Sequence, residues 1–316
     1  MKVSLVVPCY NEENNVAKFF EVADAAFENK EFEYEIIFVN DGSKDNTYTE
    51  LKNLFATHPD KVSVVNLSRN FGKEAAILAG LKRASGDYIS LVDADLQQRP
   101  EIVADMVQYL EEHEEYDVVA AYQEHRIEGK FMSGVKKLFY MLINKVCDIE
   151  FYAGASDFRT FRRTVAEALI SIPEYHRFSK GLFSWIGFNT HYLPYVAEER
   201  NAGETKWSVK KLIKYAMEGF MSFTTTPLRF ATYLGMLVSV CAVLYMIFVI
   251  IKTLIFGEAV QGYPTIVTLI LFLSGVQLLI LGILGEYLAR IYVQGKNRPV
   301  YIEKEYLHEA KAEAGE

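Results

Sequence analysis

Two carboxylates stand one residue apart, at Asp93 and Asp95, directly after a mostly apolar run over residues 87–92. The run predicts a buried strand, and ligands of open α/β sheets bind beyond the carboxyl ends of the strands. Carboxylate oxygens there could hold Mg²⁺ or Mn²⁺, which could bridge to a diphosphate. The alternative is that both acids only cap the helix that we expect to begin near Pro100. The elements around this pair must decide between the two interpretations.

Three strand–loop–helix units precede the pair. Each unit has a short apolar run, a polar loop and a stretch with helical periodicity: strands at 3–7, 34–40 and 62–67, and helices at 16–27, 44–55 and 73–84. A further helix at 100–112 and a strand at 117–122 are expected. This alternation predicts a Rossmann-like, mostly parallel sheet with helices on both faces, whose right-handed crossovers bring the loops to one edge. The loops should therefore converge on Asp93 and Asp95.

The first two loops carry residues that suit a nucleotide. Tyr10 offers a ring that could lie against a base, and its neighbours Pro8, Asn11 and Glu12 share its loop. Asp41 directly follows the second strand, a position where an acid commonly binds ribose hydroxyls. Asn, Asp and Gly are also preferred in turns, so each residue alone is a weak signal. Their convergence at one edge is what favours nucleotide binding.

Two stretches, 230–251 and 262–285, contain no charged residue. Each is long enough to cross roughly 30 Å of hydrocarbon. We therefore expect a transmembrane hairpin over 230–290, with helices at 230–251 and 265–288; a hairpin buried in a soluble protein is the alternative. Basic residues flank the hairpin on both sides, so the positive-inside rule places both of its ends in the cytoplasm.

Two further stretches alternate apolar residues with lysines at helical spacing, at 131–146 and within 206–229. This composition suits helices that lie on an anionic membrane surface, although ordinary surface helices would show the same pattern. The chain is thus divided into a catalytic domain (1–205), a juxtamembrane helix (206–229), the hairpin and a cytoplasmic tail (291–316). From residue 301 the tail is polar and acid-rich, and we expect it to fray.

Composition excludes other classes. The chain has 316 residues, 51% of them hydrophobic, a net charge of −8 and a pI of about 5.4, so it lacks the basic footprint of nucleic-acid binding. Its three cysteines show no pairing or metal-ligand spacing, which favours a reducing compartment and argues against a zinc site. The first residues do not resemble a secretory signal, so the first domain should stay in the cytoplasm.

Several motifs together resemble those of family 2 glycosyltransferases, which have a GT-A fold. They are VPCYNEE at 7–13, VNDGS at 39–43, LSRNFGK at 67–73 and DADLQ at 93–97. With SDFR at 156–159, GETKWS at 203–208 and the hairpin, they are similar to the polyprenyl-phosphate branch, which includes dolichol-phosphate mannose synthases and bactoprenol glucosyltransferases. The resemblance covers nearly the whole chain. It implies an inverting, metal-dependent enzyme of the bacterial cytoplasmic membrane that transfers a sugar from a nucleotide donor to undecaprenyl or another polyprenyl phosphate. UDP-glucose is the first choice of donor, with GlcNAc, mannose or another sugar as alternatives.

The resemblance also implies roles for individual residues. Asp157 would be the catalytic acidic residue, and Asp95 and Gln97 would hold Mg²⁺ or Mn²⁺. The donor is bound by Pro8, Tyr10, Asn11, Glu12, Asp41, Arg69, Lys73, Asp93 and Ala94. Phosphate is bound by Arg126, Lys137, Arg200 and Lys206. The chain departs from the family pattern at Gln98 and Arg99, where Asp-Pro is common, and at Thr205, where serine is usual.

Simpler interpretations exist for some of these residues. Asp157 could be a turn residue paired with Arg159 or Arg162, Arg69 and Lys73 could be exposed charges, and Lys206 could be an interfacial anchor.

Other protein classes also stay open. A nucleotidyltransferase uses paired acids as well, but it usually opens with a glycine- and arginine-rich phosphate loop. A processive polysaccharide synthase should have more membrane helices and a Gln-x-x-Arg-Trp motif, which is absent from this sequence. A non-catalytic membrane-tethered protein that binds nucleotide sugars is a third class. A homo-oligomer is compatible with small residues on the second membrane helix: Gly275, Gly282 and Gly285.

Overall fold

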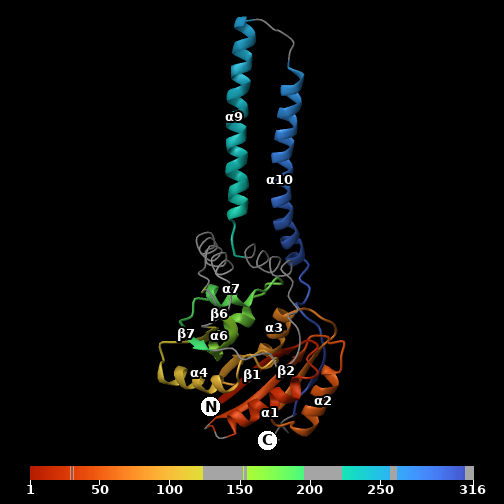
Figure 1. Ribbon diagram of the computed structural model, residues 1–316, viewed down its shortest axis with the longest axis vertical. Coiled ribbons are helices and arrows are strands. Elements are labelled where there is room, and N and C mark those ends of the chain that lie inside the picture. Colours follow the sequence, from red (N-terminus) through yellow and green to blue (C-terminus); the bar gives the residue numbers. More distant parts are fainter. Residues whose placement is uncertain are drawn as a thin grey trace, which may run out of the picture.

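The structure is a computed structural model that describes residues 1–28, 30, 32–123, 152, 155–195, 223–256 and 262–309. Within these residues the chain forms one eight-stranded sheet, in the order β7-β5-β6-β4-β1-β2-β3-β8, and two long helices that project from it (Figure 1). The expected amphipathic helix at 131–146 lies outside the described residues, and so do residues 206–222 of the expected juxtamembrane helix at 206–229.

Four parallel strands form the centre of the sheet: β1 (Lys2–Cys9), β2 (Glu33–Asn40), β3 (Val62–Leu67) and β4 (Tyr88–Leu91). Their side chains are buried on both faces, as parallel strands covered by helices require. In β1, Leu5 packs into the core on one face and Val6 into the core on the other. The predicted α/β class and its mostly parallel sheet are therefore confirmed.

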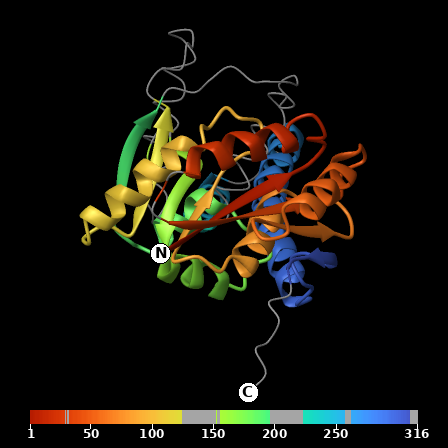
Figure 2. The same ribbon diagram turned by 90° about the horizontal axis from the view of Figure 1, so that it is seen from below.

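Helices cover both faces of this sheet (Figure 2). One face is covered by α1 (Val16–Phe27), α2 (Thr47–Thr57) and α4 (Glu101–Glu112), and the other by α3 (Lys73–Arg83) and α6 (Arg163–Ser171). Each predicted helix in this part of the chain is present. The observed and expected bounds of these helices differ by at most three residues at their ends.

The sheet is completed by β5 (Val118–Gln123), β6 (Ala155–Arg162) and β7 (Thr190–Tyr195). The strand β6 is antiparallel to both of its neighbours, β4 and β5. Because β6 runs against β4, its first residues lie at the edge where β4 ends. Asp157 is thereby brought to the same edge as the loop after β4.

The two projecting helices are α9 (Thr226–Phe256) and α10 (Tyr263–Gly295). Both are long and apolar enough to cross a membrane, and their large side chains are exposed, with Leu254 80% and Leu278 69% accessible. A buried soluble hairpin would hide such residues, so that alternative is disfavoured. The helix α10 runs beyond the predicted end at residue 288. Glu286 and Arg290, one turn apart on either side of that position, form an ion pair at 3.5 Å.

After α10 the chain returns to the sheet as β8 (Glu303–Leu307), antiparallel to β3. Arg83 binds both carboxylate oxygens of Glu303, at 2.7 and 3.3 Å, and lies 4.2 Å from the ring of Tyr306. The expectation that the chain frays from residue 301 is wrong for this strand. Two of the acidic residues that suggested a solvated tail have partners on the domain: Glu303 binds Arg83, and Glu305 accepts the hydroxyl of Tyr48.

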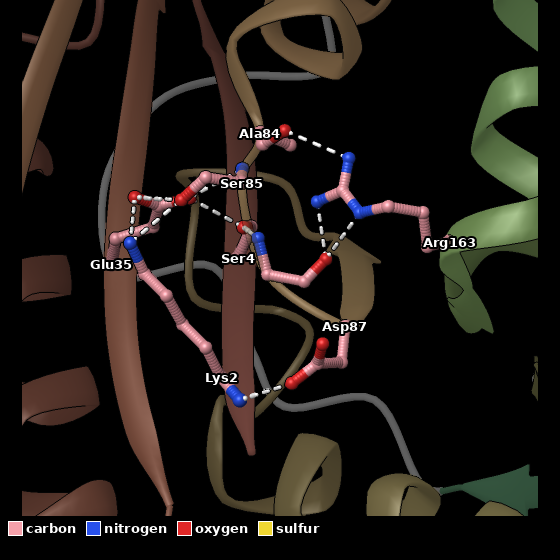
Figure 3. A network of polar contacts seen from close by, with 8 residues as sticks. Lys2, Ser4, Glu35, Ala84, Ser85, Asp87 and Arg163 are labelled. Carbon is pink, nitrogen blue, oxygen red and sulfur yellow. Dashed lines mark hydrogen bonds and ion pairs between the residues drawn. The ribbon is translucent and has the colours of Figure 1, made fainter.

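A polar network closes the amino edge of the sheet (Figure 3). The carboxylate of Glu35 receives Lys2 Nζ at 2.6 Å and the hydroxyl of Ser4 at 2.6 Å. The backbone amide of Lys2 donates to Asp87 at 2.8 Å, and the guanidinium of Arg163 donates to two backbone carbonyls of the α3–β4 connection. Burial would raise the pKa of Glu35, but Lys2, Ser4 and Ser85 lower it below its ordinary value. These groups satisfy one another, which makes the network structural.

Candidate functional site

The loops after β1 and β2 are bonded to each other at the carboxyl edge of the sheet. Asn11, which has a φ of 55°, receives the backbone amide of Lys44 on its side-chain oxygen at 2.9 Å and donates its own amide to Ser43 at 3.0 Å. The amide of Glu12 donates to Thr47 at 2.8 Å. The predicted donor-binding residues of the first loop are thus held on a fixed backbone, and Tyr10 beside them is half-buried.

Asp41 directly follows β2 and is only 3% exposed. Its two carboxylate oxygens accept the backbone amides of Phe71 at 2.7 Å and Gly72 at 2.9 Å. Burial raises the pKa of Asp41, while these two amides and Arg69 partly offset the rise. The sequence predicts a ribose contact for Asp41. The structure adds a second role, which is to hold the loop that leads into α3.

The same loop explains Gly42. This glycine has a φ of +61°, and a Cβ there would lie 2.3 Å from the carbonyl carbon of Arg69 and 2.4 Å from the amide nitrogen of Asn70. Both atoms belong to the backbone and cannot rotate away. The loops after β2 and β3 therefore touch backbone to backbone, and the guanidinium of Arg69 lies 4.1 Å from the ring of Phe71.

Lys73, the first residue of α3, lies between two acids from other elements. Its Nζ is 2.6 Å from Asp93 Oδ1, in the loop after β4, and 3.1 Å from Asp157 Oδ2, near the start of β6. The carboxylates raise the pKa of Lys73 above its ordinary value, although burial alone would lower it. The structure thus brings together three of the residues that the sequence singles out, from positions up to 84 residues apart.

Asp157 is 21% exposed and carries a strongly perturbed charge. Burial would raise its pKa, but Lys73, Lys180 and Arg159 hold the pKa well below its ordinary value. Among the described residues its second oxygen, Oδ1, is buried and has no hydrogen-bond partner. A buried polar atom without a partner is costly, so Oδ1 is suited to receive a group from a ligand.

The alternative role of Asp157, as a turn residue paired with an arginine, is not favoured. Arg162 donates to the carbonyls of Tyr116 and Leu110 and to the hydroxyl of Tyr88. Arg159 donates to the carbonyl of Ser156 at 2.9 Å, and its guanidinium lies 4.1 Å from the ring of Phe183. Asp157 forms an ion pair with Lys73, at 3.1 Å, and the charge of Arg159 also lowers the pKa of Asp157.

The loop after β4 is shaped by its own side chains. Gln98 accepts the amide of Asp93 at 2.9 Å and donates to its carboxylate at 3.2 Å, so the residue that departs from the family pattern holds Asp93 in place. The amide of Gln97 donates to Asp95 at 3.2 Å, and Leu96 has a φ of +59°. The helix α4 starts at Glu101 and has no side-chain cap, so Asp93 and Asp95 do not serve as its caps.

Asp95 and Gln97 fit a divalent cation by their chemistry. Both offer hard oxygen donors on one tight loop. The described part of the chain holds no group of three or more His, Cys, Asp or Glu residues that could bind a metal by themselves. Mg²⁺ and Mn²⁺ sites on phosphorylated substrates need only one or two carboxylates, because substrate oxygens and water supply the other ligands.

Other predicted site residues have simpler surroundings or cannot be placed. Pro8 is the second-to-last residue of β1, and Ala94 is buried beside Asp93. The carboxylate of Glu12 accepts the side-chain amide of Asn15 at 2.6 Å. The predicted phosphate-binding residues lie outside the described residues: Arg126, Lys137, Arg200 and Lys206.

Glu74, which follows Lys73, was not singled out from the sequence. Its partly buried carboxylate accepts the amide of Ser179 at 3.0 Å and also its hydroxyl, at the start of α7 (Ser179–Trp185). Burial, and then the charge of Asp157, raise the pKa of Glu74. The pairing joins positions 105 residues apart and has no local sequence signal.

Comparison with known proteins gives matches over both parts of the chain. The family model described as glycosyl transferase family 2 matches residues 4–170, and the one described as GtrB C-terminal hairpin matches residues 226–291. The putative glycosyltransferase CsbB of Bacillus subtilis is 41% identical over 303 residues, which is 96% of this chain and 91% of the relative. The bactoprenol glucosyl transferase of Shigella phage SfV is 41% identical over 304 residues, which is 96% of this chain and 98% of the relative.

Solved structures are more distant. The mannosyltransferase PcManGT from Pyrobaculum calidifontis, in complex with GDP-Man and Mn²⁺, has a TM-score of 0.47 at 16% identity, over 88% of this chain and 86% of its own. The family assignment therefore comes from the sequence relatives.

Proposed function

The chain belongs to glycosyl transferase family 2, and on that premise we propose that it transfers glucose from UDP-glucose to undecaprenyl or another polyprenyl phosphate. It is a glycosyltransferase with a GT-A fold, as the motifs predict. One observation carries the finer proposal: the same chain has two parts. One is a sheet edge of the kind that binds nucleotides, where Lys73 brings Asp93 and Asp157 together, and the other is an exposed apolar hairpin. A soluble phosphorylated donor and a lipid acceptor need both parts.

The reaction is a single displacement with inversion at the sugar. A phosphate oxygen of the lipid attacks the anomeric carbon, and the nucleoside diphosphate leaves with the electron pair of the broken bond. A phosphate monoester has a second pKa of about 6, so much of the acceptor is already a dianion at neutral pH and needs no strong base. Asp157 then orients the sugar, whose hydroxyls can donate to the carboxylate oxygen that has no partner among the described residues. Its repulsion of the acceptor dianion would be offset by basic residues such as Arg126, Lys137 or Lys206.

The donor is held by the loops after β1, β2 and β4. We expect Tyr10 to lie against the base, and the backbone amides of Asn11 and Glu12 beside it donate to Ser43 and Thr47. Asp41, Asp93 and Ala94 line the same edge, and Arg69 and Pro8 complete the proposed donor set. These assignments rest on the family motifs together with the shared edge of the sheet.

Asp95 and Gln97 would hold Mg²⁺ or Mn²⁺ at the donor diphosphate. When bound, the cation offsets negative charge that grows on the leaving diphosphate. Arg126, Lys137, Arg200 and Lys206 are proposed to bind phosphate groups, and this assignment rests on the family motifs alone. A homo-oligomer is proposed on the small residues of α10.

The return of β8 to the sheet supports the proposed membrane topology. β3 precedes α9 and β8 follows α10, yet the two strands are hydrogen-bonded to each other, with the amide of Ser68 also bonded to the carbonyl of Ile302 at 2.9 Å. If both helices cross the membrane, the chain must end on the side where it began. We propose that this is the cytoplasmic side of the bacterial cytoplasmic membrane, as the flanking basic residues predict.

The test incubates the purified full-length protein with undecaprenyl phosphate, Mg²⁺ or Mn²⁺, and radiolabelled UDP-glucose, UDP-GlcNAc or GDP-mannose. We expect labelled lipid from UDP-glucose, loss of the product with EDTA, and a fall in kcat of about 100-fold for Asp157→Asn. The matched control is Asp60→Asn, which removes an exposed carboxylate in the α2–β3 connection.

The other protein classes predict different results. A nucleotidyltransferase would instead release pyrophosphate when it is given a nucleoside triphosphate and a sugar phosphate, and a membrane-tethered binding protein would retain the donor without turnover. If no donor gave labelled lipid, the proposed function would be wrong.

A further inference from the structure

Lys73 was expected to contact the donor, but its ammonium group already lies between Asp93 and Asp157. On the basis of the proposed function, we propose that Lys73 is a positioning residue that binds one oxygen of Asp157 and leaves the other to accept a hydroxyl of the donor sugar. It also ties Asp157 to the loop after β4 through Asp93. Lys73 therefore couples the carboxylate that orients the sugar to the loop that binds the nucleotide.

The backbone of Lys73 is fixed from the neighbouring strand. Gly72, the residue before it, has a φ of +100°, and the amides of Phe71 and Gly72 both donate to the buried carboxylate of Asp41. α3 therefore starts at a position that β2 sets. A lysine at the first position of this helix can reach the loop after β4 and the start of β6, because both lie at the same sheet edge.

A second contact braces the same turn of α3. Glu74 accepts both the amide and the hydroxyl of Ser179 at the start of α7. A Cβ on Gly181, in α7, would lie 2.3 Å from the ring of Phe223, just before α9. The first turn of α3 is thus held by β2 on one side and by α7 on the other, which restricts the position of Lys73.

The charges around Asp157 make Lys73 difficult to replace. Among the described residues, Lys73, Lys180 and Arg159 are cations that lower the pKa of Asp157, and Asp157 in turn raises the pKa of Glu74. Lys73 forms an ion pair with Asp157, at 3.1 Å. Removing Lys73 leaves Asp157 beside Glu74 and Asp93 with less compensation, which should raise the pKa of Asp157 and loosen its orientation.

The first test measures coupling without catalysis. The thermal midpoint of the detergent-purified full chain is measured for wild type, Lys73→Met, Asp157→Asn and the double variant. We expect Lys73→Met to lower the midpoint and the double variant to recover part of the loss, because the buried charge left unpaired is then removed. Lys82→Met, an exposed lysine on the same helix, is the control and should change little.

Additive effects in this cycle would overturn the coupling. Because the cycle does not need turnover, it separates a failure of this inference from a failure of the proposed function.

The second test is kinetic. We expect Lys73→Met to lower kcat by about 100-fold with little change in the KM for the donor, and Lys73→Arg to restore part of the rate. A loss confined to the KM of the donor, with kcat unchanged, would make Lys73 a donor contact and contradict the proposal.

Discussion

Glu35 is a charged residue that lies far from the proposed site and contributes to the stability of the fold. It accepts Lys2 and Ser4, and Ser85 through both amide and hydroxyl, at the amino edge of the sheet (Figure 3). Three elements meet at this carboxylate, because Ser85 follows α3. It therefore contributes stability and is remote from the proposed chemistry at the opposite edge.

We predict that Glu35→Gln lowers the free energy of unfolding by about 1–3 kcal/mol at pH 7. The pKa of Glu35 is lower in the folded than in the unfolded chain, so its contribution is present above the unfolded pKa. It is lost as the pH falls through the folded pKa. Thermal unfolding between pH 7 and pH 3 should show the gap between wild type and variant closing on acidification.

The control for this prediction is Glu114→Gln, in an exposed position after α4. A gap at Glu35 that stayed constant with pH would show that the residue contributes through shape and not through charge.

At the residue scale, the sequence identified the acids but not their partners. Asp93, Asp95 and Asp157 could be singled out from residue type and motif. The ion pairs of Lys73 join α3 to the loop after β4 and to β6, and the bonds of Asp41 join β2 to the loop before α3. Such contacts depend on which strands lie side by side, and no local pattern reports that.

At the scale of elements, strand β6 was the main omission. Runs of apolar residues predicted β1 to β5, and the predicted bounds of α1 and β3 match those observed. β6 carries Asp157, Arg159 and Arg162 within eight residues, so its composition does not suggest a strand. It forms because it is inserted between β4 and β5, where Phe158 and Phe161 are fully buried.

Contact between loops gives a prediction at this scale. Gly42→Ala should displace the loop after β3, because the new Cβ would meet backbone atoms of Arg69 and Asn70 and φ is +61°. We expect a loss of stability of more than about 1 kcal/mol together with an increase in the KM for the donor. Chemical denaturation and donor titration would measure the two effects.

Gly187→Ala is the matched control. It also has a positive φ, +71°, but its Cβ would have nothing within 4 Å. If both variants lost the same stability and the donor KM did not change, backbone strain alone would explain Gly42.

At the scale of the whole molecule, the hairpin should matter for the lipid and not for the donor. Replacing residues 226–295 with a long flexible polar linker keeps β8 attached while removing the apolar helices. We predict a fall of about 100-fold in transfer to a long polyprenyl phosphate, because a membrane-bound acceptor is no longer presented to the site. Hydrolysis of the donor, and transfer to a short water-soluble prenyl phosphate, should change much less.

An equal loss of all three activities would indicate that the hairpin supports the fold of the domain instead. Measuring the thermal midpoint of the linker variant would identify that outcome.

The edge strand β8 also has a consequence for the order of synthesis. β3 is made early, whereas its partner β8 emerges only after both apolar helices have left the ribosome. During translation the edge of β3 is therefore unpaired, a state that invites pairing with other chains. The sheet can therefore be completed only after both apolar helices have been synthesised. If the hairpin inserts as it is made, the catalytic domain is finished only on a chain that has already reached the bilayer.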